Sequence, residues 1–362
     1  MRFRYSIEKT KKNKKPVKKA VVYTQDEHGV DRADVDNDAM YIVERLALAG
    51  YETYIVGGAV RDLILGKKPK DFDIVSAASP SQIKKLFRNA RVIGNRFRLV
   101  HVSIGEKIFE VATFRSIKEG PTGNIFGTIE EDVLRRDFSI NALFYDPCEQ
   151  LVVDYVGGMD DIKKRQIRPL ISLKTIFVDD PVRMIRAVKY AATTGFSLPA
   201  SLSLKIRQQS KLLAGISHSR LTEEIFKIIR SSSAVKIAES LEEFGLYQYL
   251  QPNASKLLKE NSEFRERYFR TLATLNQTTA APGENLAGLV SDFLELVVDW
   301  NGEPMETYNY AFSQARHFVL PMNPPRFEIE WAIKTIFKAH GILIKRTMFT
   351  DRIKRQETTS DR

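Results

Sequence analysis

The order strand, two glycines, helix, strand constrains the fold of this chain more than any other feature. The run "ETYIV" (52–56) is typical of a short strand, and Gly57-Gly58 ends it. The run "AVRDLILG" (59–66) is predicted to be a short helix, and "DFDIV" (71–75) is predicted to be a second strand. Such an alternation over so few residues indicates a sheet-based α/β fold.

The second strand carries two acids that raise an electrostatic question. In a strand, Asp71 and Asp73 share one face, while Phe72 and Ile74 take the other. Two neighbouring carboxylates repel each other unless a cation lies between them. Hard oxygen ligands suit Mg²⁺, which prefers a few carboxylates together with substrate phosphates and water. The alternative is a solvated strand end that binds nothing.

The glycine pair at 57–58 offers a second clue. Adjacent glycines at a helix start can bring backbone N–H groups close to phosphate oxygens. The stretch is not a P-loop, because no Gly-Lys-Ser/Thr follows, and it lacks the G-x-G-x-x-G dinucleotide fingerprint. An ordinary turn explains the pair equally well when it is taken alone.

The rest of the chain divides into a sheet-rich first part and a helical second part. Helices are predicted over 36–50 and 79–89, and strands over 97–104, 108–114, 142–146 and 150–156. From Asp179 onward, helical periods dominate. We therefore predict an α/β head with a mixed sheet followed by an all-helical body, which is an α+β protein overall.

The net charge of +11 lies at the two ends of the sequence. Residues 1–20 carry nine Lys or Arg against one acid, and residues 341–362 carry six against three, so these ends hold the whole excess. Basic ends on a neutral body suit a polyanion such as RNA. A solubilising disordered tail is the alternative. Residues 1–35 are predicted to be a basic flexible tail.

Cysteine content and hydropathy indicate the compartment. The single cysteine, Cys148, excludes an intramolecular disulfide framework and a zinc cage built from cysteines. No run of about 18 apolar residues occurs, and the N-terminus is charged rather than signal-like. These features predict a soluble cytoplasmic protein that does not enter a membrane.

A series of motifs in a fixed order gives the chain a specific resemblance. The run "YIVGGAVRDLILGKKPKDFDIV" resembles the head of the class II nucleotidyltransferases, the family of bacterial poly(A) polymerases and CCA-adding tRNA nucleotidyltransferases. The resemblance continues through "FEVATFR", "IEEDVLRRDFSINAL", "DYVGGMDDI", "DDPVRMIRAVKYAA" and "SRLTEEIFKII". It implies a nucleotidyltransferase catalytic head over 36–165, a helical nucleotide-reading neck over 166–250, and a helical RNA-binding body and tail over 251–362.

The resemblance also implies an activity and a set of site residues. The activity is template-independent transfer of a nucleoside monophosphate from an NTP to an RNA 3′-hydroxyl, with release of pyrophosphate and two Mg²⁺ ions. Asp71 and Asp73 would hold the metal, and Asp137 matches a position in the family's active site. The residues expected to bind the NTP in the head are Gly57, Gly58, Arg61, Arg135 and Arg136.

Two of these assignments have plain alternatives. Glu110 lies on a predicted hairpin strand and would be a third carboxylate facing the metal, or an ordinary acid at a strand edge. Arg135 and Arg136 would meet the triphosphate or ribose, or form a solvated pair.

The motif "DDPVR" predicts how a base is read. Pro181 suits the first position of a helix, which makes Asp180 the expected N-cap and places Arg183 on the same side. In the family the corresponding Asp and Arg read the incoming base. An acceptor beside a donor fits adenine and cytosine but not guanine or uracil. A helix cap with an ion pair is the alternative, and this chain has Asp179-Asp180 where the family usually has Glu-Asp.

The helix beyond this motif contributes one more predicted residue. Arg220 and Glu224 lie four residues apart and would brace the reading site, with Arg220 placed among the substrate-binding residues. An exposed salt bridge between the two is the simpler interpretation.

The branch of the family follows from two short runs. The pattern G-x-RFRL-x-H within 92–101 and the run "NIFGTIEED" (124–132) resemble poly(A) polymerases, whereas the eight residues 116–123 are fewer than that branch would suggest. None of the five histidines is followed by Asp, so no HD phosphohydrolase motif is present. We predict AMP transfer from ATP to RNA 3′ ends. CCA addition to tRNA and a catalytically silent RNA-binding protein are the alternatives.

Overall fold

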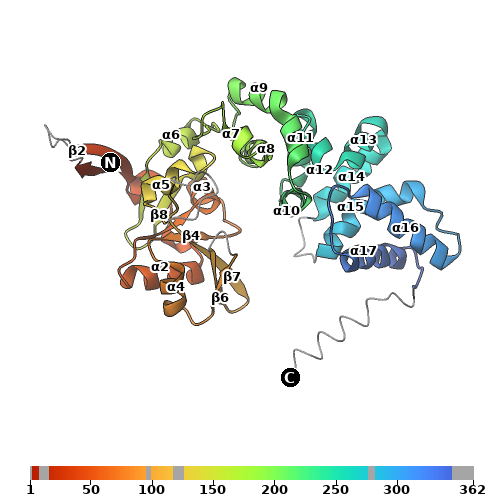
Figure 1. Cartoon of the computed structure of the whole chain (residues 1–362), viewed down its shortest axis with the longest axis horizontal. Coiled ribbons are helices and arrows are strands. Elements are labelled where there is room, and N and C mark those ends of the chain that lie inside the picture. Colours follow the sequence, from red (N-terminus) through yellow and green to blue (C-terminus); the bar gives the residue numbers. More distant parts are fainter. Residues whose placement is uncertain (1, 8–15, 95–98, 117–125, 276–281, 345–362) are drawn as a thin grey trace. The chain divides into compact units, whose positions relative to one another are not determined.

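The 362-residue chain folds into two compact units in a computed structural model, which describes residues 2–7, 16–94, 99–116, 126–275 and 282–344. The first unit comprises Met1–Asp179 and Phe196–Leu202, and the second comprises Asp180–Gly195 and Ser203–Arg362 (Figure 1). The predicted α/β head and helical body are confirmed as a fold class.

The first unit extends beyond the predicted head boundary at residue 165. Ile167, Ile176 and Phe177 are fully buried. The backbone of Phe196–Leu202 also returns to the first unit, because Ile167 N–H donates to Ser197 O at 2.9 Å. The buried side chains of 166–179 therefore belong to the head, and the predicted neck begins later than expected.

One mixed sheet of nine strands organises the first unit. The strand order is β1-β2-β9-β8-β3-β4-β7-β6-β5, and the pair β4–β7 is parallel while the other pairs are antiparallel. The strands are β1 Arg2–Ile7, β2 Pro16–Tyr23, β3 Thr53–Val56, β4 Asp73–Ser76, β5 Ala90–Ile93, β6 Leu99–Ile104, β7 Lys107–Thr113, β8 Leu143–Asp146 and β9 Leu151–Asp154.

The helices of the first unit connect these strands or, as α6 and α7, follow the last strand. They are α1 Gln25–His28, α2 Asn37–Leu48, α3 Gly58–Ile64, α4 Pro80–Leu86, α5 Ile129–Leu134, α6 Gly158–Lys163 and α7 Ile176–Asp179, together with the 3₁₀ turns Arg32–Asp34 and Ser139–Asn141. Local signals set their ends. Ser79 and Gln82 form a capping box at α4, and Pro80 occupies its first turn, within the helix predicted over 79–89.

The predicted flexible tail over 1–35 is wrong for the residues that the structure describes. Strand β2 pairs with β9, and β1 pairs with β2, so both strands extend the sheet. Ala20 and Tyr23 are buried. Arg4 donates to the hydroxyl oxygens of Tyr54 at 3.2 Å and Tyr155 at 3.0 Å. These contacts hold β1 and β2 on the sheet, although the lysine-rich composition of 1–20 resembles a solvated tail in sequence.

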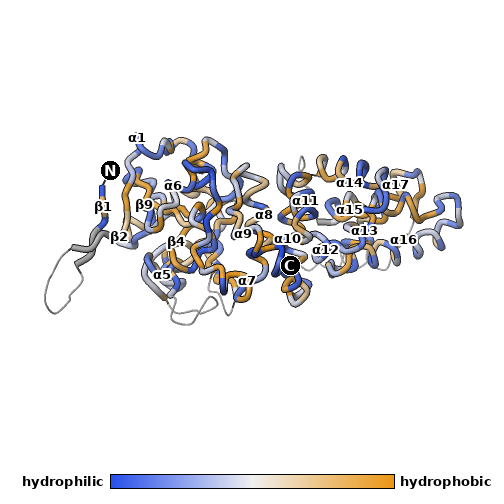
Figure 2. Tube along the Cα trace, turned by 90° about the horizontal axis from the view of Figure 1, so that it is seen from above, coloured by the Kyte–Doolittle hydropathy of each residue, from blue (hydrophilic) through white to orange (hydrophobic). Residues whose placement is uncertain are grey.

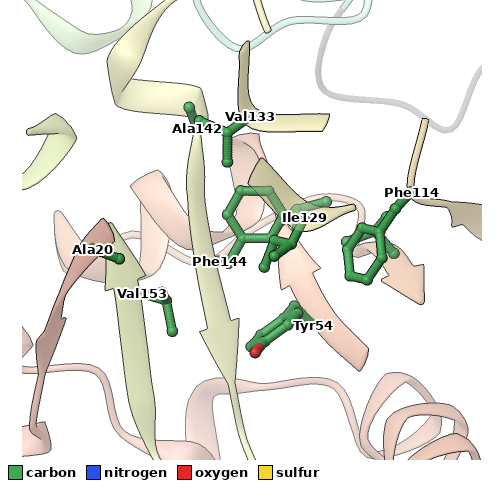
Figure 3. Close-up of a cluster of buried hydrophobic side chains, with 10 residues drawn as sticks. Ala20, Tyr54, Phe114, Ile129, Val133, Ala142, Phe144 and Val153 are labelled. Carbon is green, nitrogen blue, oxygen red and sulfur yellow. The ribbon is translucent and has the colours of Figure 1, made fainter. Parts of the chain in front are cut away.

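A cluster of apolar side chains covers one face of the sheet. Tyr54 and Phe144 meet edge to face with their ring centroids 5.8 Å apart. Ile129 and Val133 of α5 pack onto this face (Figure 3). The cluster also includes Val56, whose register partner in β4 is Asp73. The core therefore fixes the strand ends where the predicted metal ligands lie.

Amphipathic helices build the second unit. They are α8 Val182–Thr194, α9 Ala200–Gln209, α10 His218–Ile229, α11 Ala234–Glu243, α12 Tyr247–Leu250, α13 Pro252–Glu260, α14 Ser262–Leu275, α15 Pro282–Val297, α16 Pro304–Phe318 and α17 Arg326–Ala339, with the 3₁₀ turn Ser210–Gly215. The first residues of α9 belong to the first unit. Figure 2 shows hydrophobic and hydrophilic residues alternating along these helices.

Aromatic side chains fill the core of the second unit. Phe293 stacks on Phe318 with 4.2 Å between the ring centroids, and Phe264 stacks on Tyr268 at 5.3 Å.

No helix in the described part of the chain is both long and apolar enough to cross a lipid bilayer. The cytoplasmic location stays a prediction of the sequence.

Candidate active site

The candidate active site lies at one end of the central strands of the sheet. Across neighbouring strands, Asp73 is the register partner of Val56, and Val56 is the partner of Phe144. Asp73 is the first residue of β4, and its side chain is exposed, as is that of Asp71. The predicted strand over 71–75 begins two residues later than expected. Asp71 therefore precedes the strand, and the face-sharing argument does not apply to it.

Gly57 is the turn residue between β3 and α3, and two charged groups approach it. Its backbone has φ 72° and ψ −134°, a conformation that residues with a side chain rarely adopt. An ideal β-carbon on Gly57 would lie 3.8 Å from Arg136 Nη1 and 3.8 Å from Asp73 Oδ2. The turn thus lies beside both a carboxylate and a guanidinium, which the sequence places more than 60 residues apart.

Arg136 is held by several groups in the head. Its Nη2 donates to Asp132 Oδ2 at 2.9 Å, and its Nη1 donates to Asn141 O at 3.1 Å. The guanidinium carbon lies 4.9 Å from the centroid of the Phe144 ring. Because Asp132 is buried, its ion pair with Arg136 holds the guanidinium in one position. A fixed cation beside Asp73 is suited to an anionic ligand.

Arg135 and Asp137 flank Arg136 and are both half-buried. Arg135 Nη1 donates to Ser116 O at 2.7 Å. Burial lowers the pKa of Arg135, and the neighbouring Arg115 lowers it further. The backbone carbonyl of Asp137 accepts from Leu170 N–H at 3.1 Å. The structure therefore orders this short segment next to Arg136, and the catalytic role of Asp137 stays a prediction.

Arg61 and Gly58 lie in α3, and Arg61 has a clear structural function. Its side chain is buried; Nη1 donates to Asn141 Oδ1 at 2.8 Å, and Nε donates to Asp62 Oδ1 at 2.9 Å. Arg61 Nη2 lies 3.5 Å from the position of a β-carbon on Gly58. Arg61 joins α3 to the 3₁₀ turn at Ser139–Asn141, and its contact with an NTP stays a prediction.

Glu110 occupies the strand next to Asp73. In the parallel pair β4–β7, Ile74 lies opposite Val111, so Asp73 and Glu110 each come one residue earlier. Glu110 is exposed, and its Oε1 lies 3.8 Å from Nε2 of His101 on β6. Within the described ranges, no group of three or more His, Cys, Asp or Glu side chains is arranged to hold a metal. The register alone therefore supports Glu110 as a ligand.

Asp154 is a structural residue of the head that sequence reasoning missed. It is buried, and its carboxylate accepts backbone N–H groups from four successive residues at 2.8–3.0 Å, namely Val156, Gly157, Gly158 and Met159. A β-carbon on Gly158 would lie 2.4 Å from Ser139 O. The D-x-x-G-G spacing in "DYVGGMDDI" was the available signal, since an acid before two glycines can cap a helix that packs closely.

In the second unit, Asp180 is bound by a residue that lies far away in the sequence. Arg220 Nη2 donates to Asp180 Oδ1 at 2.9 Å and Oδ2 at 3.0 Å. Asp180 Oδ1 also accepts from Val182 N–H at 3.2 Å. Helix α8 begins at Val182 with Pro181 as its N-cap, so the predicted start is one residue early. Arg183 is buried in the first turn of α8.

The predicted salt bridge between Arg220 and Glu224 is not the arrangement in the structure. Glu224 is buried and lies 3.2 Å from Lys189 Nζ, 3.7 Å from Arg186 Nε and 3.6 Å from Lys227 Nζ. Burial by itself raises the pKa of Glu224, but the three cations outweigh it and lower the pKa below the ordinary value. Arg220 is therefore available to Asp180, and Glu224 joins α8 to α10.

We expect Glu224→Gln to reduce the free energy of unfolding by about 3 kcal/mol at pH 7, because three cations lose their buried partner. The pKa of Glu224 is lower in the folded than in the unfolded protein, so its ionised carboxylate stabilises the fold at pH values above the unfolded-state pKa. This stabilisation is lost as the pH falls through the folded-state pKa, because the carboxylate becomes protonated. Urea unfolding at pH 7 and at successively lower pH should show the difference between wild type and variant shrinking.

The matched control for this prediction is Glu243→Gln. Glu243 is exposed and pairs only at the surface with Arg207 at 3.1 Å, so its loss should change stability by less than about 1 kcal/mol at any pH. A Glu224→Gln deficit of the same size at every pH would show that the carboxylate charge has no part in the packing of α8 on α10.

Two protein-family models match successive parts of this chain. Residues 53–168 match the family model of the poly A polymerase head domain. Residues 195–258 match a second model, described as the probable RNA and SrmB-binding site of polymerase A. The two matches follow each other in the chain, and the first spans β3, β4, β7 and the whole candidate site of the head.

Three curated relatives show the extent of the similarity. Poly(A) polymerase I of Salmonella typhi is 42% identical over 258 residues, which is 67% of this chain and 56% of the relative. Poly(A) polymerase I of Haemophilus influenzae is 37% identical over 284 residues, 74% of this chain and 62% of the relative. The CCA-adding enzyme of Geobacillus stearothermophilus is 34% identical over 225 residues, 60% of this chain and 55% of the relative. The chain thus spans somewhat more than half the length of these relatives.

Solved structures share the fold. The Bacillus stearothermophilus CCA-adding enzyme in complex with CTP matches with a TM-score of 0.56 and 26% identity, over 83% of this chain and 82% of that one. The Thermotoga maritima CCA-adding enzyme complexed with tRNA matches with a TM-score of 0.57 and 22% identity, over 88% and 85% of the two chains. The ordered domain matches and the relatives together show that this chain belongs to the class II nucleotidyltransferase family.

Proposed function

We propose that the protein transfers AMP from ATP to the 3′-hydroxyl of RNA and releases pyrophosphate. In this reaction the RNA 3′-oxygen forms a bond to the α-phosphorus, and the bond from that phosphorus to the bridging oxygen of the pyrophosphate breaks. The proton of the hydroxyl leaves to solvent or to a carboxylate. The protein therefore needs to position two anionic substrates and to stabilise charge on the phosphoryl oxygens.

The observation that carries the proposal is the convergence of Asp73 and Arg136 on the turn at Gly57. A carboxylate and a fixed guanidinium beside a glycine turn offer a seat for a cation and a contact for phosphate oxygens in one place. The small turn residue keeps that place open, since a side chain on Gly57 would begin within 4 Å of both groups. Arg135 would add a second cation for the phosphate oxygens, and Asp137 would add a carboxylate to the site.

Asp71 and Asp73 fit a magnesium site that is completed by substrate. Mg²⁺ binds through one or two protein carboxylates plus phosphate oxygens and water, so a third carboxylate is not required. Both side chains are exposed, as a site that must admit the triphosphate demands. Two bound Mg²⁺ ions would activate the attacking hydroxyl and neutralise the leaving pyrophosphate. We propose Asp71 and Asp73 as the ligands, with Glu110 as an additional one.

Asp180 and Arg183 are proposed to read the base. The carboxylate of Asp180 would accept from the exocyclic amino group of adenine, and Arg183 would donate to the adjacent ring nitrogen. The contact from Arg220 supports this role, because it holds both oxygens of Asp180 in one orientation. Arg220 is thus proposed as a positioning residue rather than a direct ligand of the NTP.

The similarity to the curated relatives favours ATP as the only nucleotide substrate over the use of both CTP and ATP. The identity to poly(A) polymerase I is 42%, compared with 34% to a CCA-adding enzyme. We propose RNA 3′ ends as the acceptor, the first unit up to Asp179 as the catalytic head, residues 180–250 as the nucleotide-reading neck and 251–362 as the RNA-binding body. The family match over 195–258 supports RNA binding by the neck and the first residues of the body.

The experiment that tests this function offers ATP and CTP separately to two RNAs. One RNA ends in oligo(A), and the other is a tRNA without its CCA end. We expect long tails of A only on the first RNA and little use of CTP. Addition that needs both nucleotides and stops after CCA on the tRNA would establish the CCA-adding alternative. Binding of RNA without any extension would favour the silent RNA-binding protein.

A further inference from the structure

A pocket in the second unit lies between the end of α16 and the start of α17, outside the residues that match either family model. Its volume is about 400 Å³, within the ~300–1,000 Å³ range of ligand sites. It is lined by Phe312 and Arg316 of α16, by 323–325, and by Arg326 and Ile329 of α17. Helices α16 and α17 are neighbours in the second unit (Figure 1). We refer to it as the α16–α17 pocket.

Two polar side chains of this pocket have unused hydrogen-bonding capacity. Arg316 is exposed, and its guanidinium forms no hydrogen bond or ion pair with any residue that the structure describes. The side-chain amide of Asn323 likewise has no partner within the described ranges. An unpaired guanidinium at a pocket wall is suited to a phosphate, and an amide can donate to and accept from a base edge.

The aromatic wall of the α16–α17 pocket is held in place. The guanidinium carbon of Arg326 lies 5.3 Å from the centroid of the Phe312 ring. Arg326 Nε donates to Glu330 Oε1 at 2.8 Å, and Glu330 is buried. The planar guanidinium is therefore fixed over the ring before any ligand binds. Pro324 and Pro325 add rigid apolar surface between the two helices.

We propose that the α16–α17 pocket binds one nucleotide of the single-stranded RNA substrate. The base would lie against Phe312 and the proline rings, and Arg316 would contact the adjoining phosphate. Stacking on an aromatic ring together with a nearby cation is how proteins hold single strands without reading their sequence. A base inside a duplex is stacked on its neighbours and cannot enter such a pocket. This inference rests on RNA being the substrate under the proposed function.

The test measures binding of the full chain to a short labelled oligo(A) by fluorescence anisotropy, without ATP or Mg²⁺. We expect Phe312→Leu to weaken binding about fivefold or more, the low end of what one stacked base contributes. We expect Arg316→Gln to lower the slope of log K against log salt by about 0.7, the value for one phosphate on a single strand. An abasic oligomer with the same phosphates should bind wild type and Phe312→Leu equally.

The matched control is Lys338→Gln, which removes one exposed positive charge from the same helix as Arg326. The inference is overturned if wild type does not bind oligo(A), if both pocket variants bind it as Lys338→Gln does, or if Phe312→Leu weakens binding of the abasic oligomer equally. The exposed Arg316 gives a variant that should fold normally even if Phe312→Leu does not. If both pocket variants bind oligo(A) like wild type and still add A normally, the pocket does not bind RNA, and the proposed function is unaffected.

Discussion

We expect Asp73→Asn to lower the rate of AMP transfer to RNA by about 10²–10³-fold or more, the effect of losing one fixed electrostatic partner of the transition state. The amide keeps the shape of the side chain but removes the charge that would hold Mg²⁺. Asp73 is exposed, so the variant should fold like wild type and unfold at the same urea concentration. Initial rates of primer extension with ATP measure the effect.

Asp26→Asn is the control for this change, because Asp26 is an exposed acid of the same unit that lies in α1. Its rate should equal that of wild type. If Asp73→Asn extends RNA within tenfold of this control, Asp73 does not hold a catalytic metal. The convergence of Asp73 and Arg136 at Gly57 would then have only a structural meaning.

Asp154→Ala is expected to have the largest effect on stability. The carboxylate accepts from four backbone N–H groups, and its removal leaves buried donors that cost about 1–3 kcal/mol each when unpaired. Because water can reach some of them, we expect a total loss of about 3–5 kcal/mol in the free energy of unfolding. Urea denaturation followed by circular dichroism measures this loss.

Two further variants sharpen this prediction. Asp154→Asn retains one acceptor oxygen, so its loss should fall between wild type and Asp154→Ala. Asp160→Ala removes an exposed acid from α6 and should cost less than about 1 kcal/mol. Equal stability of Asp154→Ala and Asp160→Ala would show that the four hydrogen bonds do not hold the segment between β9 and α6.

Sequence patterns predicted the elements whose signals are local. The hairpin of β6 and β7 follows from two apolar runs around Gly105, and α4 lies within the helix predicted over 79–89. Strand β2 was missed because its partner β9 lies about 130 residues away, and its lysines suggest solvent rather than a sheet. A pairing between distant segments leaves little trace in either segment alone.

The same distinction holds for the candidate site. The order of its motifs identified Asp73 and Asp180 as site residues, since each lies in a short run with a recognisable pattern. The motifs also identified Arg136 for the NTP and Arg220 as a brace of the reading site, but not the groups they contact: Arg136 approaches Gly57 through the packing of α5 on the sheet, and Arg220 reaches Asp180 across 40 residues. Helical spacing suggested that Arg220 would form a salt bridge with Glu224. Glu224 instead pairs with Arg186, Lys189 and Lys227.

The most direct test of the proposed activity counts both products of one reaction. Wild-type protein with ATP, Mg²⁺ and an oligo(A)-ended RNA should release one pyrophosphate for every nucleotide added to the 3′ end. The same RNA with a 3′-deoxy terminus should gain no nucleotide and release no pyrophosphate, because the attacking oxygen is missing. Pyrophosphate release without RNA extension, or extension of the 3′-deoxy RNA, would contradict transfer of AMP to an RNA 3′-hydroxyl.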